Sequence, residues 1–375
     1  MPRRLLHVHQ PVEAGVPRVV ASLVADQVHR GYEVHVASPA DSEYVRATTE
    51  LGASHHEWPA TRSPSVRVTA ETRSLARIVN RVDPDLVVLH SSKAGLAGRL
   101  AVRGRRSTVF APHAWSFVAV RGPVGALAAG WEAFAARWTH RIICVSEDER
   151  AVGQDEGIQV PTVVVPNGVD VGVLSPRPAG AARQRLGLPH APTAVCVGRL
   201  AEQKGQDQLL DAWAEVLSVV PDARLVLVGD GPLRETLEAR APHGVLFAGA
   251  QLDPSDYYAA ADVVAVPSRW EGGPLVPLEA MAMARPVVAF DVAGVRAALG
   301  TTGAVLQPGD VRGLAAALIR LLADPAAAAA DGRAARVRAL EVADLRTSLR
   351  SWDDVVSELI GDRSGATPSA LGVPR

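Results

Sequence analysis

The chain has 375 residues, of which 48% are hydrophobic and 21% charged, and its formal net charge is -1. This length favours two domains of roughly 150–200 residues, and the apolar content supplies both cores and excludes intrinsic disorder. A net charge near zero gives no general attraction to nucleic acid, and no nucleic-acid partner is expected.

Cys144 and Cys196 each lie in an apolar run without metal-ligand spacing, which predicts buried, reduced thiols in a cytoplasmic protein. The N-terminal segment MPRRLLHVHQ lacks the long apolar stretch of a signal peptide. No window approaches the roughly 18 uninterrupted apolar residues of a spanning helix. We therefore expect a cytoplasmic protein that is at most peripheral on the inner face of the cell membrane.

Short β-branched runs alternate with longer helical patterns along the first half, which is typical of parallel α/β folds. Amphipathic helices such as Val19–Arg30 and Thr69–Val82 separate the predicted strands. These strands are Leu5–His9, Glu33–Ala37, Leu86–His90, Thr108–Ala111, Ile142–Val145 and Thr162–Val165.

The same rhythm restarts at Thr193, after a Pro-, Gly-, Ala- and Arg-rich segment, Ser175–Pro192, that predicts a linker with a short helix. The strands predicted in this half are Ala194–Val197, Arg224–Val228, Val245–Phe247, Val263–Val266 and Val287–Ala289. The sequence therefore predicts two doubly wound domains of parallel strands, joined near residue 180.

Ligands of open α/β sheets bind beyond the carboxyl ends of the strands, so the segments that follow the strands are candidates for a site. Strands of the second half are followed by GRLAEQKG, GDGP and PSRWEGGP, and those of the first half by PVEAG, HSSKAG, PHAW, SEDE and PNGVD. Two such polar, glycine-rich edges that face each other predict a cleft between the domains.

Arg199 and Lys204 lie in the turn between a strand and a helix that is expected to begin near Gln206. A cation at a helix N-terminus opposes the macrodipole, and a bound anion would offset that cost. The pair is therefore a candidate anion site, and a solvated turn with incidental charges is the alternative.

Glu271 and Glu279 flank the segment GGPLVPL. Its glycines and first proline place Glu271 on a loop, and Pro277 suits the first position of a helix from Leu278 to about Ala284. Carboxylates can accept hydrogen bonds from sugar hydroxyls, and free amides at a helix start can receive phosphate oxygens, which predicts a sugar-and-phosphate site. For Glu279 the alternative is simple stabilisation in the first helical turn.

The pattern VGRLAEQKG, LVGDGPLRETLE and FAGAQLDPSDYYAAADVVAVPSRWEGGPLVPLEAMAMARPVVAFDVAG resembles the retaining glycosyltransferases of family four, which have the GT-B fold. Upstream, APHAWSF, IICVSEDE and VPNGVD resemble the same family in the same order, so the resemblance covers about residues 5–360. It implies a metal-independent hexosyltransferase without a cofactor, which uses a nucleoside-diphosphate-sugar, with UDP favoured as the carrier.

By this resemblance Arg199 and Lys204 hold the donor diphosphate, Glu279 accepts the ribose hydroxyls, and Glu271 binds hydroxyls of the transferred sugar. His113 matches the family histidine that reaches the donor sugar, whereas without the family it is more typical of a structural residue. The other donor-binding positions that the resemblance implies lie in the loops at the strand ends: Gly15, Gly229, Gly249, Gly272, Gly273, Pro274, Leu275 and Val276.

Two positions depart from the family pattern. The first loop usually carries a Gly-Gly pair, and this chain has Ala14-Gly15; Gly15 still lets the backbone approach a phosphate, whereas Ala14 has to avoid the φ > 0 geometry that glycine tolerates. Many relatives have His-Gly where this chain has His113-Ala114, which predicts reduced loop freedom rather than lost activity.

The resemblance implies retention of the anomeric configuration by front-face attack, since no double-displacement nucleophile is visible. Negative charge develops on the leaving β-phosphate, where Arg199, Lys204 and helix amides would stabilise it. A nicotinamide dehydrogenase would need G-x-G-x-x-G after the first strand, which HQPVEAGVPR lacks. A transferase with a soluble small-molecule acceptor and a non-catalytic nucleotide-sugar-binding protein remain open alternatives.

The stretch from Ser91 to Arg141 carries eight Lys and Arg residues against one acid, Glu132, and interleaves them with six Trp and Phe residues. Such a mixture suits a surface that touches anionic lipid headgroups. The alternatives are a solvated basic helix with its aromatic residues in the core, and nucleic acid, for which no recognition motif is present.

HSSKAGLAGRLAVR followed by APHAWSF resembles the family-four subgroup that extends polyprenyl-diphosphate-linked sugars. It implies a lipid-linked glycan acceptor, used in the synthesis of cell-surface polysaccharides or glycoconjugates. The implied acceptor residues are His90, Ser91, Lys93 and Trp115, with Lys93 at a helix start that Ser91 or Ser92 caps.

We expect a Rossmann-like acceptor-side domain over residues 1–175 and a Rossmann-like nucleotide-sugar domain over residues 190–345. Residues 346–361 are expected to form a helix that crosses back to the first domain, as in related GT-B enzymes, because Trp352, Val355, Val356 and Leu359 recur at helical spacing. Residues 362–375 are Gly-, Pro- and Ser-rich and are expected to be disordered.

Overall fold

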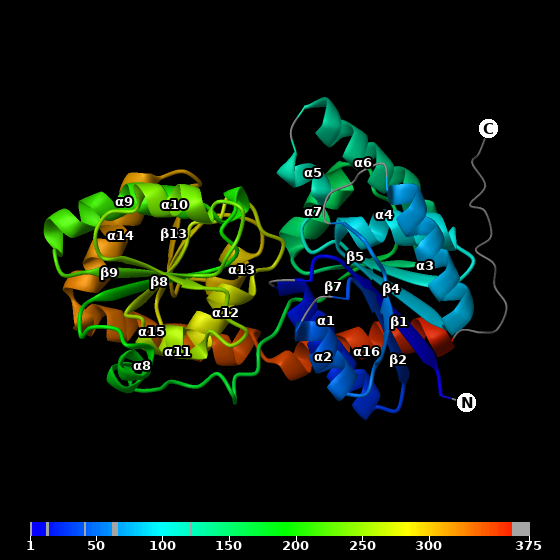
Figure 1. Cartoon of the computed structure of the whole chain (residues 1–375), viewed down its shortest axis with the longest axis horizontal. Helices are drawn as coiled ribbons and strands as arrows, with labels where there is room; N and C mark the ends of the chain where they lie inside the picture. Colours follow the sequence, from blue (N-terminus) through cyan, green and yellow to red (C-terminus); the bar gives the residue numbers. More distant parts are fainter. Residues whose placement is uncertain (1, 13–14, 41–42, 62–66, 121, 362–375) are drawn as a thin grey trace. The chain divides into compact units, whose positions relative to one another are not determined.

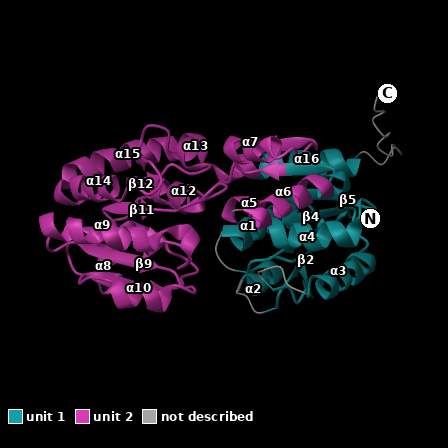
Figure 2. Cartoon of the chain, turned by 90° about the horizontal axis from the view of Figure 1, so that it is seen from above, with its two compact units in different colours: residues 1–111, 135–142, 349–375 teal, residues 112–134, 143–348 magenta. Residues whose placement is uncertain are grey.

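The computed structural model describes residues 2–12, 15–40, 43–61, 67–120 and 122–361. The chain divides into two compact units (Figure 2). Unit 1 comprises Met1–Ala111, Ala135–Ile142 and Leu349–Arg375, and unit 2 comprises Pro112–Phe134 and Ile143–Ser348. This division follows spatial contacts, so the domain limits expected from chain order stay predictions, and the tail 362–375 lies outside the described residues.

The first sheet has seven strands in the order β3-β2-β1-β4-β5-β6-β7, and the pairings from β3 to β6 are parallel (Figure 1). Its strands are β1 (Arg4–His9), β2 (Glu33–Ser38), β3 (Ser54–Glu57), β4 (Leu86–His90), β5 (Ser107–Ala111), β6 (Arg141–Cys144) and β7 (Thr162–Val164). The sequence did not predict β3, because its segment SHHE lies partly exposed at the sheet edge and has no apolar run.

The second sheet has six parallel strands in the order β10-β9-β8-β11-β12-β13. Its strands are β8 (Thr193–Val197), β9 (Arg224–Val228), β10 (Val245–Gly249), β11 (Val263–Val266), β12 (Val287–Phe290) and β13 (Ala304–Leu306). The predicted class, two doubly wound parallel sheets, is confirmed. Only the short, half-buried edge strand β13 was not predicted in this half.

Helices connect the strands of both sheets. Those of the first half are α1 (Gly15–His29), α2 (Glu43–Glu50), α3 (Val68–Val82), α4 (Ser91–Val102), α5 (Ser116–Ala119), α6 (Pro123–Ala135), η1 (Ala136–Trp138) and α7 (Glu147–Asp155). Those of the second half are α8 (Ala179–Leu186), η2 (Glu202–Lys204), α9 (Gln206–Val219), α10 (Arg234–Arg240), α11 (Ser255–Ala260), α12 (Leu275–Ala282), α13 (Val295–Leu299), α14 (Val311–Ala323), α15 (Pro325–Val342) and α16 (Leu345–Gly361). The short helix expected in the linker is α8, but its Ala182 is fully buried and belongs to the core.

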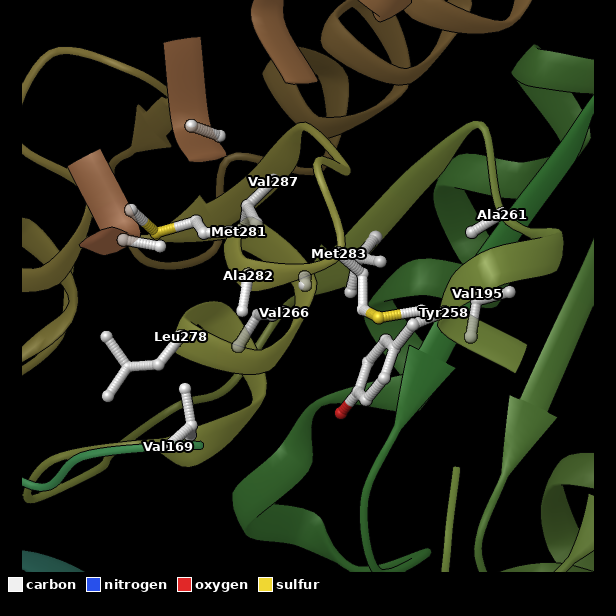
Figure 3. Packing of buried hydrophobic residues seen from close by; sticks show 14 of the residues in the cluster. Val169, Val195, Tyr258, Ala261, Val266, Leu278, Met281, Ala282, Met283 and Val287 are labelled. Atoms are coloured by element: carbon white, nitrogen blue, oxygen red, sulfur yellow. The ribbon is translucent and has the colours of Figure 1, made fainter. Parts of the chain in front are cut away.

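The second sheet is buried on both faces, which explains its nearly continuous apolar strands. Val195 and Val264 point into a core with helices α11, α12 and α15, where Figure 3 shows Tyr258 beside Met283. Their sequence neighbours Ala194 and Val263 point into a second core with α9 and α14. Alternate side chains of one strand therefore hold helices on opposite sides of the sheet.

Both sheets reverse their strand order beside their first strand, between β1 and β4 and between β8 and β11. Such a switch point opens a crevice at the carboxyl ends of the strands, where ligands of doubly wound folds bind. In the second sheet the two strands end at Val197 and Val266. The fold therefore directs attention to the residues that follow these two strands.

The C-terminal helix α16 places residues 349–361 in unit 1. Trp352, Val355 and Val356 are buried, as their helical spacing predicts, and the Trp352 ring lies 5.8 Å from that of His90. Among the described residues no single helix is long and apolar enough to span a membrane; α14 and α15 together meet the length and composition test but are bent by 105°.

Candidate active site

Glycines bring three turns of unit 2 together at the carboxyl ends of β8, β9 and β10. A Cβ on Gly229, which follows β9, would overlap the carbonyl oxygen of Gly198, which follows β8. The Gly229 amide donates to the carbonyl of Gly249, at the end of β10, at 2.8 Å. The predicted positions Gly229 and Gly249 thus lie next to the turn that carries Arg199 and Lys204, and Gly229 allows the two backbones to approach closely.

Lys204 ends η2 directly before α9, which begins at Gln206 as predicted. Its Nζ lies 2.5 Å from Oε1 of Glu271, and the two side chains are 19% and 7% exposed. Arg199 lies half-buried in the same turn, and its carbonyl accepts a hydrogen bond from Gln206 Nε2 at 3.0 Å. The structure therefore brings the predicted cation Lys204 and the predicted sugar-binding carboxylate Glu271 into direct contact.

Arg269 fixes the loop that carries Glu271. Its guanidinium makes two hydrogen bonds, of 2.8 and 2.6 Å, to the carboxylate of Asp207 in the first turn of α9. The hydrogen bond from Arg269 holds the pKa of Asp207 below its usual value. Gln203 adds two bonds, because its carbonyl accepts from Arg269 N at 2.7 Å and its Nε2 donates to Trp270 O at 3.0 Å. The sequence did not predict this support, although Arg269 adjoins the motif.

Glu279 lies deeper than the sequence predicts. Helix α12 begins at Leu275, with Pro274 as its N-cap, so Pro277 is the third helical residue and not the first. A proline fits there equally well, because the first four helical amides lack an intrahelical acceptor. Glu279 therefore lies beyond the first turn, and helix-end stabilisation does not explain it.

The Glu279 side chain is fully buried, and its Oε2 accepts a hydrogen bond from Tyr258 OH at 2.6 Å. Tyr258 lies on α11 and its ring is buried in the core. Burial of a carboxyl group costs free energy unless such hydrogen bonds satisfy it. The sequence did not predict Tyr258, because its spacing on α11 is that of an ordinary core residue.

Two side chains hold the carbonyls of Gly272 and Gly273. Ser146 Oγ, at the end of β6, donates to Gly272 O at 2.8 Å, and Asn167 Nδ2, which follows β7, donates to Gly273 O at 2.7 Å. Both residues stand in strand-end segments, SEDE and PNGVD, but their partners could not be predicted. Together with Pro274, Leu275 and Val276, these glycines form the entry to α12.

The loop that carries His113 packs directly on Gly272. His113 and Ala114 both have positive φ angles, 51° and 87°, a conformation that costs a non-glycine residue roughly 1–2 kcal/mol. A Cβ on Gly272 would lie 2.6 Å from Ala114 N, so this glycine is required by the close approach. Burial lowers the pKa of His113 to about 4, so its imidazole is neutral at neutral pH.

Trp115 and Lys93 both have partners inside their own unit. Trp115, in unit 2, is 3% exposed and donates from Nε1 to the Glu149 carbonyl at 2.7 Å. Lys93, in unit 1, is buried with its Nζ 2.6 Å from Glu71 Oε2. Burial raises the pKa of Glu71, but hydrogen bonds from Lys93 and Thr61 outweigh it and hold that pKa below its usual value. The acceptor roles of Lys93 and Trp115 stay predictions.

The expected cap on α4 is wrong. His90 is the N-cap, but its side chain makes no capping hydrogen bond; its Nε2 lies 2.9 Å from Nδ1 of His7. Ser91 Oγ donates to the Gln10 carbonyl. The basic stretch is also partly internal, because Arg99 is 1% exposed and lies 4.1 Å above the Phe110 ring. Gly15 is the first residue of α1, whereas Ala14 lies outside the described residues.

Within the described part of the chain, no group of three or more His, Cys, Asp or Glu side chains is arranged to hold a metal ion. One Asp-x-Asp triplet, Asp83-Pro84-Asp85, is present, and its carboxylates pair with arginines: Asp83 with Arg4 at 3.1 Å and Asp85 with Arg3 at 3.6 Å. Metal independence stays a prediction.

Comparison with known proteins agrees with this geometry. The family model described as Glycosyltransferase Family 4 matches residues 14–173, and the one described as Glycosyl transferases group 1 matches residues 191–324. UDP-Gal:alpha-D-GlcNAc-diphosphoundecaprenol alpha-1,3-galactosyltransferase of Escherichia coli is 30% identical over 269 residues, which are 67% of this chain and 70% of that protein.

The GDP-mannose-dependent alpha-(1-6)-phosphatidylinositol monomannoside mannosyltransferase of Mycolicibacterium smegmatis is 39% identical over 201 residues, 49% of this chain and 53% of that relative. The chain thus spans about half the length of this curated relative. Two solved structures have a TM-score of 0.81: HepE of Anabaena with UDP and glucose (22% identity, 95% of this chain and 100% of that chain) and sucrose-phosphate synthase of Thermosynechococcus elongatus (21%, 96% and 99%).

The two doubly wound sheets, which match these two solved structures over 95% and 96% of this chain, have the GT-B class of fold. Within that class the chain belongs to glycosyltransferase family 4.

Proposed function

We propose that this chain is a retaining, metal-independent glycosyltransferase that moves a hexose from a nucleoside-diphosphate-sugar to a hydroxyl of a glycan or lipid-linked acceptor. UDP is the favoured carrier, and the product belongs to cell-surface polysaccharide or glycoconjugate synthesis. The observation that carries the proposal is the Lys204–Glu271 pair beside Gly272 and Gly273, at the switch point of the second sheet.

The donor diphosphate binds beside Arg199 and Lys204, where the amides at the start of α12 supply further donors. A phosphate oxygen competes with Glu271 for the Lys204 ammonium. Glu271 is then available to accept hydrogen bonds from the hydroxyls of the sugar. Glu279, which Tyr258 holds from the core side, accepts hydrogen bonds from the ribose hydroxyls.

In the chemical step the acceptor oxygen forms a bond to the anomeric carbon on the face from which the diphosphate leaves. The bond between that carbon and the β-phosphate oxygen breaks, and the acceptor hydroxyl proton passes to the leaving phosphate. Lys204 and Arg199 stabilise the negative charge that develops on this phosphate. This stabilisation is stronger in the transition state than in the ground state, because the charge is greater there. His113, neutral at the working pH, provides a hydrogen bond to the transferred sugar.

Relatives support a lipid-linked acceptor. The Escherichia coli relative acts on a diphosphoundecaprenol-linked sugar and the mycobacterial one on a phosphatidylinositol mannoside. An enzyme that glycosylates such a lipid works at a membrane surface. We therefore extend the proposal to peripheral attachment on the inner face of the cell membrane.

The apolar surface of α5 and α6 is the proposed attachment site. These helices lie side by side (Figures 1 and 2), and Val118, Val120, Val124, Leu127 and Phe134 are 40–75% exposed. The only described charged side chain between residues 112 and 134 is Glu132, which is buried. Exposed apolar surface of this kind marks a membrane or protein interaction site.

A panel of nucleotide-sugars and free nucleoside diphosphates, measured by thermal shift, tests the donor site. A donor at 100 times its Kd raises the free energy of unfolding by about 2.7 kcal/mol, so the true donor raises the melting temperature. Transfer and slow donor hydrolysis are then assayed with and without a lipid extract. Binding without either reaction would favour the non-catalytic alternative, and transfer to water-soluble acceptors alone would favour a soluble acceptor.

A further inference from the structure

Glu149 joins the His113 loop to the end of β6. It is the third residue of α7 and is 2% exposed. Its Oε1 accepts a hydrogen bond from Ala114 N at 2.6 Å, and its Oε2 accepts one from Val145 N at 2.7 Å. A third bond, from Trp115 Nε1 to the Glu149 carbonyl, fixes the residue after Ala114.

The loop needs such support because its backbone is strained. His113 and Ala114 are consecutive non-glycine residues with positive φ, a conformation that persists only when surrounding interactions impose it. The same carboxylate lies close to Gly272, because a Cβ added to that glycine would be 3.0 Å from Glu149 Oε1. Ser146, the N-cap of α7, accepts from Glu149 N at 3.1 Å and donates to Gly272 O.

We propose that Glu149 is a positioning residue, whose carboxylate holds the strained His113–Ala114 loop against Gly272 so that His113 meets the donor sugar. The inference rests on the proposed function, because it assigns Glu149 to the reaction that His113 serves. Both oxygens accept from backbone amides, so the role requires the ionised carboxylate. A protonated or amide side chain presents a donor to one of these amides and loses that bond.

The dependence of activity on pH, on the acid side of the profile, gives a readout specific to this role. Burial raises the pKa of Glu149 to about 7, against the opposing effect of the Val145 and Ala114 hydrogen bonds. Activity should therefore fall as the pH drops through about 7, where the carboxylate takes up a proton. The other titratable or charged groups near it are His113, Cys144, Glu147, Asp148 and Arg150; burial lowers the pKa of His113 to about 4 and raises that of Cys144 far above neutrality.

The test compares Glu149→Gln, the double variant Glu149→Gln with Ala114→Gly, and the control Glu147→Gln, an exposed residue of the same helical turn. Glu149→Gln should lower kcat about 10- to 100-fold and change the Kd for UDP, or for the diphosphate that the panel selects, less than three-fold. Glycine adopts positive φ without strain. The double variant should therefore regain at least a third of the kcat of the parent protein, and its activity should no longer fall as the pH drops through about 7. Glu147→Gln should match the parent protein.

The inference is overturned if Glu149→Gln has the kcat and the pH profile of the parent protein. It is also overturned if the double variant has the same low kcat as Glu149→Gln, because a general packing defect predicts no rescue by Ala114→Gly. If Glu149→Gln does not fold, Glu149→Asp, one methylene shorter, replaces it with the same expected deficit and rescue. A parent protein that neither transfers nor hydrolyses any nucleotide-sugar refutes the proposed function instead, which separates the two failures.

Discussion

The ammonium of Lys204 lies 2.5 Å from a carboxylate oxygen of Glu271, which joins the turn after β8 to the loop after β11. In the proposed reaction both partners exchange this contact for groups of the donor. Lys204→Met should lower kcat about 100- to 1000-fold, the range for loss of one donor to a developing oxyanion. Arg240→Met, which removes an exposed ion pair with Asp211, is the control. Equal donor turnover in Lys204→Met and the control would contradict the role of Lys204.

Glu279 and Tyr258 form a second pair, in which Oε2 of a fully buried carboxylate accepts from a phenol at 2.6 Å. Glu279→Gln should weaken UDP binding about 10- to 100-fold, because hydrogen bonds to a charged group are worth about 1.5–3 kcal/mol. Tyr258→Phe should have a smaller effect in the same direction. Calorimetric titration with UDP and with inorganic pyrophosphate checks this, since pyrophosphate lacks ribose and should bind all variants alike. Parallel losses for both ligands would point to a general defect.

Gly205 is the glycine whose replacement should cost most in the turn between β8 and α9. Its φ is 64°, and a Cβ would overlap the carbonyl oxygen of Pro267, so Gly205→Ala should lower the free energy of unfolding by about 3 kcal/mol or more. Gly187 has the same backbone conformation, with φ 66° and nothing within 4 Å of a Cβ, and Gly187→Ala should cost only about 1–2 kcal/mol. Urea unfolding of the two variants tests the difference, and equal costs would exclude the clash as its cause.

Buried histidines should make the protein acid-sensitive. Burial lowers the pKa of His7 and His9 to about 4, and His7 Nε2 lies 2.7 Å from Gln27 Oε1. The unfolded state therefore binds more protons than the folded state between about pH 6.5 and 4, so stability falls as the pH falls, by roughly 2 kcal/mol per histidine at pH 5.

Urea unfolding at pH 7.5 and pH 5 measures this loss. His7 and His9 should contribute about equally to the loss, so replacing His7 with glutamine should remove about half of their joint contribution. A free energy of unfolding that is the same at both pH values would contradict the assignment.

We expect the apolar surface of α5 and α6 to bind the protein to lipid membranes. Leu127→Glu and Phe134→Glu place a charge on side chains that are 75% and 44% exposed, so the fold should tolerate them while membrane binding falls. Flotation with vesicles of phosphatidylethanolamine and phosphatidylglycerol measures the bound fraction. Leu252→Glu, at a 53% exposed leucine that follows β10, is the control. Equal flotation of all variants would assign the apolar surface to another partner.

Much of the fold could be predicted, and so could the edge of the second sheet at which Lys204 and Glu271 lie, because both depend on local sequence. Apolar runs define the strands, and the residues after them must lie at one edge of a sheet, which places Lys204 and Glu271 there. The start of α12 was misplaced because proline is tolerated at any of the first helical positions, so Pro277 does not identify the first residue.

The remaining residues act through contacts that sequence spacing does not encode. Lys93 has the position of a phosphate-binding cation, yet its partner Glu71 lies on another helix. Glu149 has the position of an ordinary acid in a first helical turn, and only the folded chain places Ala114 N against it. Pairing between distant segments decides which polar groups are available for a ligand. This pairing can be identified only from the structure.

Lys93 and Lys204 are the only lysines of the sequence, and each ammonium faces a glutamate, with side-chain exposures of 3% and 19%. Any reagent that couples to primary amines has therefore one reachable side chain, Lys204, besides the terminal amine. Immobilisation on an amine-reactive sensor chip would then block the proposed donor site on part of the molecules. Both cysteines are buried, so thiol coupling offers no alternative. An added affinity tag is the attachment that leaves this site open for binding measurements.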